Sequence, residues 1–166
     1  MVTTIKEANK SLNKNCFLKE LKKQEAGIDL KIVKVYDPIL SRNKREDFIY
    51  IDFQVMEDFK GYFKDVEETN EIKQAENIKD EIIALPFTLS LSDETGNYKI
   101  TNGKNIFNIL NYGLKQKKLV PAGNDKGFYI TFKEISEALS NLEFKGTAKE
   151  VKSNDFNNYL RLEVVE

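Results

Sequence analysis

Aromatic and basic side chains lie close together at two places in this sequence, and this combination favours one kind of chemistry. Aromatic rings stack on the bases of single-stranded nucleic acids, while Lys and Arg side chains pair with the phosphates. The pattern therefore predicts a surface for a single-stranded polyanion. The candidate residues are Lys34, Tyr36, Arg42, Lys44, Arg45 and Tyr50 at the first place, and Lys152, Phe156, Tyr159 and Arg161 at the second.

Each part of this pattern also has a purely structural interpretation, which is the more common role for loop cations and loop aromatics. Arg42, Lys44 and Arg45 would solvate a hairpin loop. Phe48, beside them in the chain, would then pack in the core. Phe156, at the tip of another predicted loop, would fold back onto the protein instead of stacking on a base.

Catalytic and metal-binding chemistry finds little support in the composition. The chain has no His and one Cys, Cys16, which excludes Ser-His-Asp and Cys-His machinery and any disulfide within the chain. Asp52, Glu71 and Lys73 superficially match the Asp…Glu-x-Lys arrangement of metal-dependent nucleases, but no strand pattern surrounds Glu71 and Lys73. We therefore expect a protein that is not an enzyme and that needs no metal and no cofactor.

The periodicity of the apolar residues predicts the elements that position these side chains. Apolar residues alternate with a period of two in the predicted strands and recur at helical spacing in the predicted helices. Pro86 marks its strand as an edge strand or a bulged one. The predicted strands are 28–36, 48–56, 82–91, 144–151 and 159–165, with a short one at 98–100, and the clearest helical stripes lie at 106–114 and 135–142.

The predicted strand 48–56 has two distinct faces. Ile49, Ile51, Phe53 and Val55 form the more apolar face, so we expect this face to pack in the core. Tyr50 then lies on the opposite, more polar face.

The order of the elements predicts the fold class. It is strand, strand, strand, helices, strand, strand, which is the order of an OB-fold, a five-stranded Greek-key barrel with its helix between the third and fourth strands. Ferredoxin-like and Rossmann folds need helices between earlier strands. We expect an α+β, mainly β protein with an OB-like barrel and a helical insertion between strands three and four, with other α+β arrangements as the alternatives.

Charge and periodicity divide the chain further. Residues 1–25 are expected to form an N-terminal helix, with its stripe over 3–24, or a flexible arm, and residues 26–166 a single OB-like domain. Residues 57–81 carry 4 basic and 9 acidic side chains. Such a stretch is typical of a solvated excursion from the core, with a short helix around 75–82 as one interpretation.

Three stretches give the chain a family resemblance: 32–36 through a polar turn into 48–53, the helical segment 103–110, and 142–146 through 159–163. Over about residues 26–166 the chain resembles the OB-fold-like single-stranded-DNA-binding proteins, and their uncharacterised relatives, of phages, plasmids and archaeal mobile elements. The resemblance implies single-stranded DNA as ligand and a role in replication or recombination. The chain lacks the acidic, Gly-rich C-terminal tail common in that group, which puts recruitment of partner proteins through such a tail in doubt.

We therefore expect a cytoplasmic protein without a membrane segment that binds single-stranded DNA. One alternative is an interaction module that contacts protein partners through the acidic segment and the N-terminal arm, whose apolar stripe would support a homo-oligomer. Another is RNA binding by the same face, since fold alone does not decide function.

Overall fold

A computed structural model describes residues 6–40, 46–65, 73–91, 97–119, 122–124, 127–152 and 158–166. Over these residues the protein is α+β and mainly β, as the order of elements predicts. The helices are α1 (Lys14–Lys22), α3 (Phe107–Gln116) and α4 (Phe132–Leu139). The strands are β1 (Ile28–Val35), β2 (Ile39–Leu40), β3 (Glu46–Val55), β4 (Lys60–Gly61), β5 (Glu76–Asn77), β6 (Ile82–Leu91), β7 (Tyr98–Thr101), β8 (Ala122–Asn124), β9 (Gly127–Ile130), β10 (Glu143–Val151) and β11 (Tyr159–Val165).

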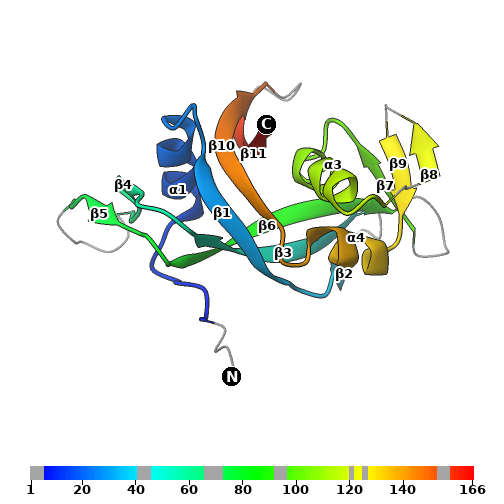
Figure 1. The fold of residues 1–166 in the computed structure, drawn as a ribbon, viewed down its shortest axis with the longest axis horizontal. Helices are drawn as coiled ribbons and strands as arrows, with labels where there is room; N and C mark the ends of the chain where they lie inside the picture. Colours follow the sequence, from blue (N-terminus) through cyan, green and yellow to red (C-terminus); the bar gives the residue numbers. More distant parts are fainter. Residues whose placement is uncertain are drawn as a thin grey trace.

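One antiparallel sheet of nine strands dominates the fold (Figure 1). Its order is β11-β10-β1-β3-β6-β7-β9-β8, with β2 added beside β3, and β4 pairs separately with β5. Strands β10 and β11 rise from the level of β3 and β6, and helices α1 and α3 lie on the side toward which they rise (Figure 1). The sheet is therefore strongly curved around the helices.

The sheet does not close into the expected barrel within the described residues, because β6 and β11 share no ladder. Helix α1 contacts both of these strands. Over residues 82–89, β6 pairs only with β3, so Pro86 occupies the edge position that its missing N–H predicts. Asn105 covers this edge: its amide donates to the Pro86 carbonyl and its oxygen accepts from the Thr88 N–H, each at 3.4 Å.

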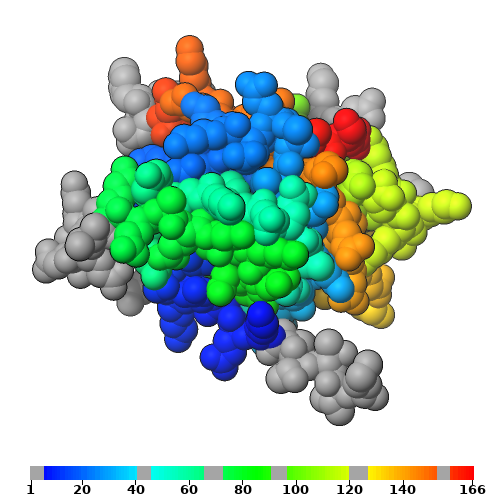
Figure 2. All heavy atoms as spheres, turned by 60° about the vertical axis from the view of Figure 1, so that its left-hand side comes forward, coloured from blue at the N-terminus to red at the C-terminus, as the bar shows by residue number. Residues whose placement is uncertain are grey.

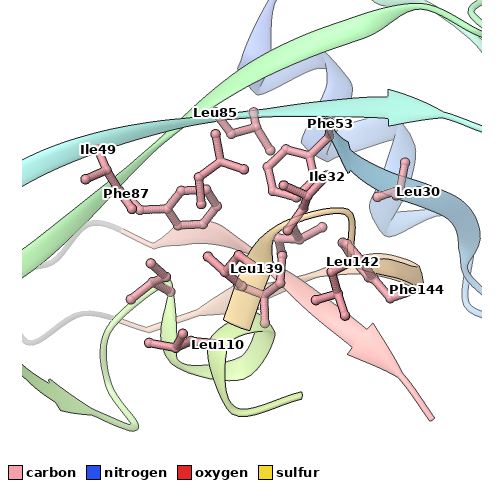
Figure 3. Close-up of a cluster of buried hydrophobic side chains, with 14 of the residues drawn as sticks. Leu30, Ile32, Ile49, Phe53, Leu85, Phe87, Leu110, Leu139, Leu142 and Phe144 are labelled. Carbon is pink, nitrogen blue, oxygen red and sulfur yellow. The ribbon is translucent and has the colours of Figure 1, made fainter. Parts of the chain in front are cut away.

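The core lies between the inner face of the sheet and the helices. The prediction for the apolar face of β3 is confirmed, since Ile49, Ile51, Phe53 and Val55 are all fully buried. Figure 3 shows the two sides of this core: Leu30, Ile32, Ile49, Phe53, Leu85 and Phe87 of the sheet face Leu110, Leu139 and Leu142 of α3 and α4 and the residues after them, with Phe144 of β10 beside them.

Helix α1 is shorter than the predicted stripe over 3–24. It begins only after Asn13, whose side chain accepts hydrogen bonds from the N–H groups of Asn15 and Cys16 and so caps the helix. Before it, residues 6–13 run without a helix, and the Asn9 N–H donates to the carbonyl of Ile82 at 2.7 Å. Residues 1–5 lie outside the described residues.

The described part of the acidic segment 57–81 differs from the solvated excursion expected. Phe59, Phe63 and Ile78 are buried, and the rings of Phe59 and Phe63 lie 5.9 and 6.4 Å from that of Phe17 in α1. The region of the expected helix forms β5 and a turn instead. Figure 2 shows the cyan-green and green spheres of this segment against the blue spheres of the N-terminal part of the chain. The buried phenylalanines of this segment therefore anchor it against α1.

The contact of α3 with α4 gives a first prediction. A Cβ on Gly113 would lie 2.5 Å from the carbonyl oxygen of Ala138, which is backbone and cannot rotate away. Gly113→Ala should therefore lower the free energy of unfolding by up to about 2 kcal/mol, because the steric overlap costs about 1–3 kcal/mol and Ala, as the better helix former, offsets about 1 kcal/mol of it. Urea unfolding measures this.

Gly103→Ala is the matched control, because a Cβ there would meet nothing within 4 Å. Equal unfolding midpoints for the two variants would contradict the close packing of α3 on α4.

Candidate functional site

A bulge in β1 decides which side chains reach the outer face of the sheet, opposite the core. Ile32 pairs with Phe53 in the core, but the register then shifts by one residue, so that Lys34 pairs with Asp52. Without this bulge Lys34 would pair with Ile51 and point into the core. The extra residue therefore brings Lys34 to the outer face and leaves Val35 on the inner one.

Tyr36 lies across the same part of the outer face. Its N–H donates to the carbonyl of Tyr50 at 3.0 Å, and its hydroxyl donates to Oδ2 of the buried Asp52 at 2.8 Å. The ammonium of Lys34 sits 4.5 Å from the centre of the Tyr36 ring, a cation–π contact. The hydrogen bond to Asp52, together with burial, raises the pKa of Tyr36 to about 12. The phenol thus keeps its proton and holds the ring in a fixed orientation.

Large aromatic side chains stand exposed on the outer face. Phe48 and Tyr50 of β3 are 39% and 42% exposed, and Tyr129 of β9 is 46% exposed. Lys99 of β7 pairs with Tyr129, and its ammonium lies 5.9 Å from the ring centre.

These residues share one face, because paired residues on neighbouring strands point the same way. Glu46 of β3 pairs with Ser90 of β6, and Ser90 in turn pairs with Lys99. The row continues to Tyr129. We call the set the aromatic face: Lys34, Tyr36, Phe48, Tyr50, Lys99 and Tyr129.

The residues predicted at the first place fall into two groups. Lys34, Tyr36 and Tyr50 come together on the aromatic face. Arg42, Lys44 and Arg45 lie outside the described residues and stay predictions; in sequence they join β2 to β3.

The residues predicted at the second place lie on the β10–β11 hairpin, and no described contact joins them to the aromatic face. Lys152 and Tyr159 are exposed there. The guanidinium of Arg161 already has partners within the protein. It pairs with Glu163 at 2.6 Å and donates to the carbonyl of Asn102 at 3.1 Å. Phe156 lies outside the described residues.

A second Tyr–Asp pair marks the opposite, inner face of β3. The hydroxyl of Tyr98 donates to Oδ2 of Asp47 at 2.6 Å, and burial, with this hydrogen bond, raises the pKa of Tyr98. Asp47 and Asp52 are both buried, and among the described residues Oδ1 of each has no hydrogen-bond partner. Within the described part of the chain, each carboxylate therefore accepts a side-chain hydrogen bond from one tyrosine.

Sequence reasoning did not single out Lys99 and Tyr129 of the aromatic face. The alternation along β3 places Phe48 beside Tyr50 on the outer face, so the structural interpretation that packs Phe48 in the core is wrong. A signal was present for Tyr129, because it alternates with Phe128 and Ile130, both buried. Residues 123–127 have the composition of a turn, so the short hairpin of β8 and β9 was not predicted.

Comparisons with family models, curated proteins and solved structures find no match for this chain, so its site is interpreted from its own geometry. Among the described residues, no group of three or more His, Cys, Asp or Glu is placed to hold a metal ion. None of the described helices is long and apolar enough to cross a membrane.

The dependence of Asp52 on Tyr36 gives a second prediction. Tyr36→Phe leaves a buried carboxylate without its donor and should lower the free energy of unfolding by about 1–3 kcal/mol at neutral pH. Because the pKa of Tyr36 rises on folding, the wild-type hydrogen bond stabilises the fold fully below about pH 10. That contribution is lost as the pH rises through about 12. Urea unfolding from pH 7 to 12 measures both effects.

Tyr50→Phe is the control, since the Tyr50 hydroxyl donates no hydrogen bond to another residue in the described part of the chain. The account is contradicted if the two variants lose stability equally at pH 7, or if the difference between Tyr36→Phe and wild type is as large at pH 12 as at pH 7.

Proposed function

We propose that this protein binds single-stranded DNA without catalysis, by stacking bases on the aromatic face and pairing phosphates with its lysines. The observation that carries the proposal is the exposure of Phe48, Tyr50 and Tyr129 on one face of the sheet. Two lysines, Lys34 and Lys99, stand against rings of the same face. Exposed rings with cations beside them are what a sequence-tolerant single-strand binder requires.

An OB-like arrangement is the finer fold proposal that supports this function. Strands β1, β3 and β6 form a meander, β10 returns to pair with β1, and α3 and α4 lie between β6 and β10 in the chain. The ligand groove of an OB-fold lies on its second and third strands, which correspond here to β3 and β6. Phe48 and Tyr50 belong to the second of these strands. OB-fold barrels are often only partly closed, as the unpaired edges of β6 and β11 would require.

The geometry suggests how the face would work. Tyr36 is held by its hydroxyl, so its ring and the ammonium of Lys34 above it are ordered before a ligand arrives. The same hydroxyl covers the carboxylate of Asp52, which would otherwise repel phosphate. Little conformational entropy is then lost on binding, which favours affinity.

DNA rather than RNA, and a role in replication or recombination of a phage or mobile element, rest on the family resemblance. The 2′-hydroxyl distinguishes the two nucleic acids, so competition between deoxy- and ribo-oligonucleotides decides between them. The alternative of a protein partner at 57–81 and the N-terminal arm would rely on their exposed charged side chains, because Phe59, Phe63 and Phe17 are already buried against one another.

Fluorescence anisotropy with a labelled oligo-dT of about 30 nucleotides, longer than the roughly 4–16 that one OB-fold covers, tests the proposal. Tyr50→Ala should weaken binding by ~1–3 kcal/mol for the base it stacks, without changing the salt dependence. Lys34→Gln and Lys99→Gln should each flatten the slope of log K against log salt by roughly 0.7, one phosphate contact.

Lys133→Gln, on the exposed side of α4, is the matched control and should leave the slope unchanged. The proposal is contradicted if the wild-type protein does not bind the oligonucleotide at low salt, or if duplex DNA competes the binding away. Unfolding curves of Tyr50→Ala show whether a loss of binding reflects a loss of fold.

A further inference from the structure

A large groove beside α1 contains a second set of basic and aromatic side chains, separate from the aromatic face. Its volume is about 1010 Å³. Five lysines line it, together with an exposed tyrosine: Lys19, Lys22, Lys23, Lys64, Lys73 and Tyr62. Among the described residues, the acidic side chains in the lining are Glu20 and Asp65, so the lysines of this α1 groove outnumber the carboxylates.

Three of the five lysines are already engaged with acidic partners. Lys22 pairs with Glu150 at 3.5 Å and Lys23 with Glu20 at 3.2 Å. Lys64 pairs with Glu76 at 3.1 Å.

The other two lysines, Lys19 and Lys73, belong to none of the ion pairs found among the described residues. The ammonium of Lys73 lies 4.8 Å from the centre of the Tyr62 ring. This repeats the pairing of Lys34 with Tyr36 and of Lys99 with Tyr129. The groove thus offers the same two contacts as the aromatic face: a cation for phosphate and a ring for a base.

The wall of the groove is held in place by the core. Phe17 and Leu21 of α1 are fully buried, so the helix turns its lysines outward. The hydroxyl of Thr147 in β10 donates to the carbonyl of Leu21 at 3.1 Å. These contacts preorganise the groove, which reduces the cost of binding.

Shared lining residues and one strand pairing link the groove to the aromatic face. Tyr50 pairs with Pro86 on the neighbouring strand. Pro86 lines a smaller pocket of about 170 Å³ at the open edge of β6, together with Asn15 and Leu160. Asn15 and Leu160 also line the α1 groove. A strand leaving Tyr50 over the edge of β6 therefore meets the groove next.

We propose that the α1 groove is a second contact site for the same single strand of DNA, with phosphates at Lys19 and Lys73 and a base on Tyr62. This inference rests on the proposed function and extends it. The footprint then runs from the aromatic face past Pro86 to α1. A short oligonucleotide fills only the aromatic face, whereas a long one reaches the groove.

Oligonucleotide length therefore separates the two sites. The test is anisotropy with oligo-dT of about 6 and about 30 nucleotides, one near the lower end of the usual footprint of roughly 4–16 nucleotides and one well beyond it. The double variant Lys19→Gln/Lys73→Gln should bind the long strand more weakly and flatten its salt slope by roughly 1.4, two phosphate contacts. Binding of the short strand should stay unchanged.

Lys115→Gln/Lys133→Gln removes two exposed lysines that belong to neither site, and it should bind both lengths like the wild type. Tyr62→Ala should likewise weaken only the long strand.

Two results would overturn the inference, and they differ. If Lys19→Gln/Lys73→Gln binds the long strand like the wild type while Tyr50→Ala weakens it, the groove is not a site and the proposed function stands. If the wild type binds neither length at low salt, the proposed function fails and the groove proposal fails with it.

Discussion

The alternation of side chains along β3 is the constraint on which the rest of the structure depends. Ile49, Ile51, Phe53 and Val55 fill the core from one face, and a strand cannot bury both sets without a second layer. Burying this set commits Phe48 and Tyr50 to the opposite face, where both are exposed and none of the described helices covers them. The core thus forces two large rings into solvent, at the centre of a nine-stranded sheet. The bulge in β1 then brings Lys34 and Tyr36 to the same face.

The open edge of β6 explains how the two proposed sites belong to one surface. Pro86 cannot donate to a neighbouring strand, Asn105 takes the nearby backbone groups, and α1 contacts both β6 and β11 where a closed barrel would pair them. Because α1 is anchored by Phe17 against Phe59 and Phe63, it stays at this edge and carries its lysines beside it. The same apolar contacts that tie the acidic segment to the core therefore also place the α1 groove.

The parts that follow from local periodicity could be predicted from the sequence, and the parts that depend on pairing could not. The two faces of β3 and the edge position of Pro86 are local patterns, and both are confirmed. The exposure of Lys34 depends on a one-residue shift in the pairing of β1 with β3, and the alternation of apolar residues does not predict this shift. The burial of Phe59 and Phe63 was not predicted, because the charge of the whole segment outweighed these two residues. Composition averages over a segment, whereas burial is a property of single side chains. Arg42, Lys44, Arg45 and Phe156 stay predictions.

Ultraviolet cross-linking of the wild-type protein to oligo-dT, followed by mass spectrometry of the linked peptides, tests the central claim most directly. It reports which side chains touch the bases and needs no variant that might unfold. The account predicts links at Phe48, Tyr50 or Tyr129, from the aromatic face, and with long strands also at Tyr62. Links confined to α3 and α4, or none at saturating DNA and low salt, would contradict it.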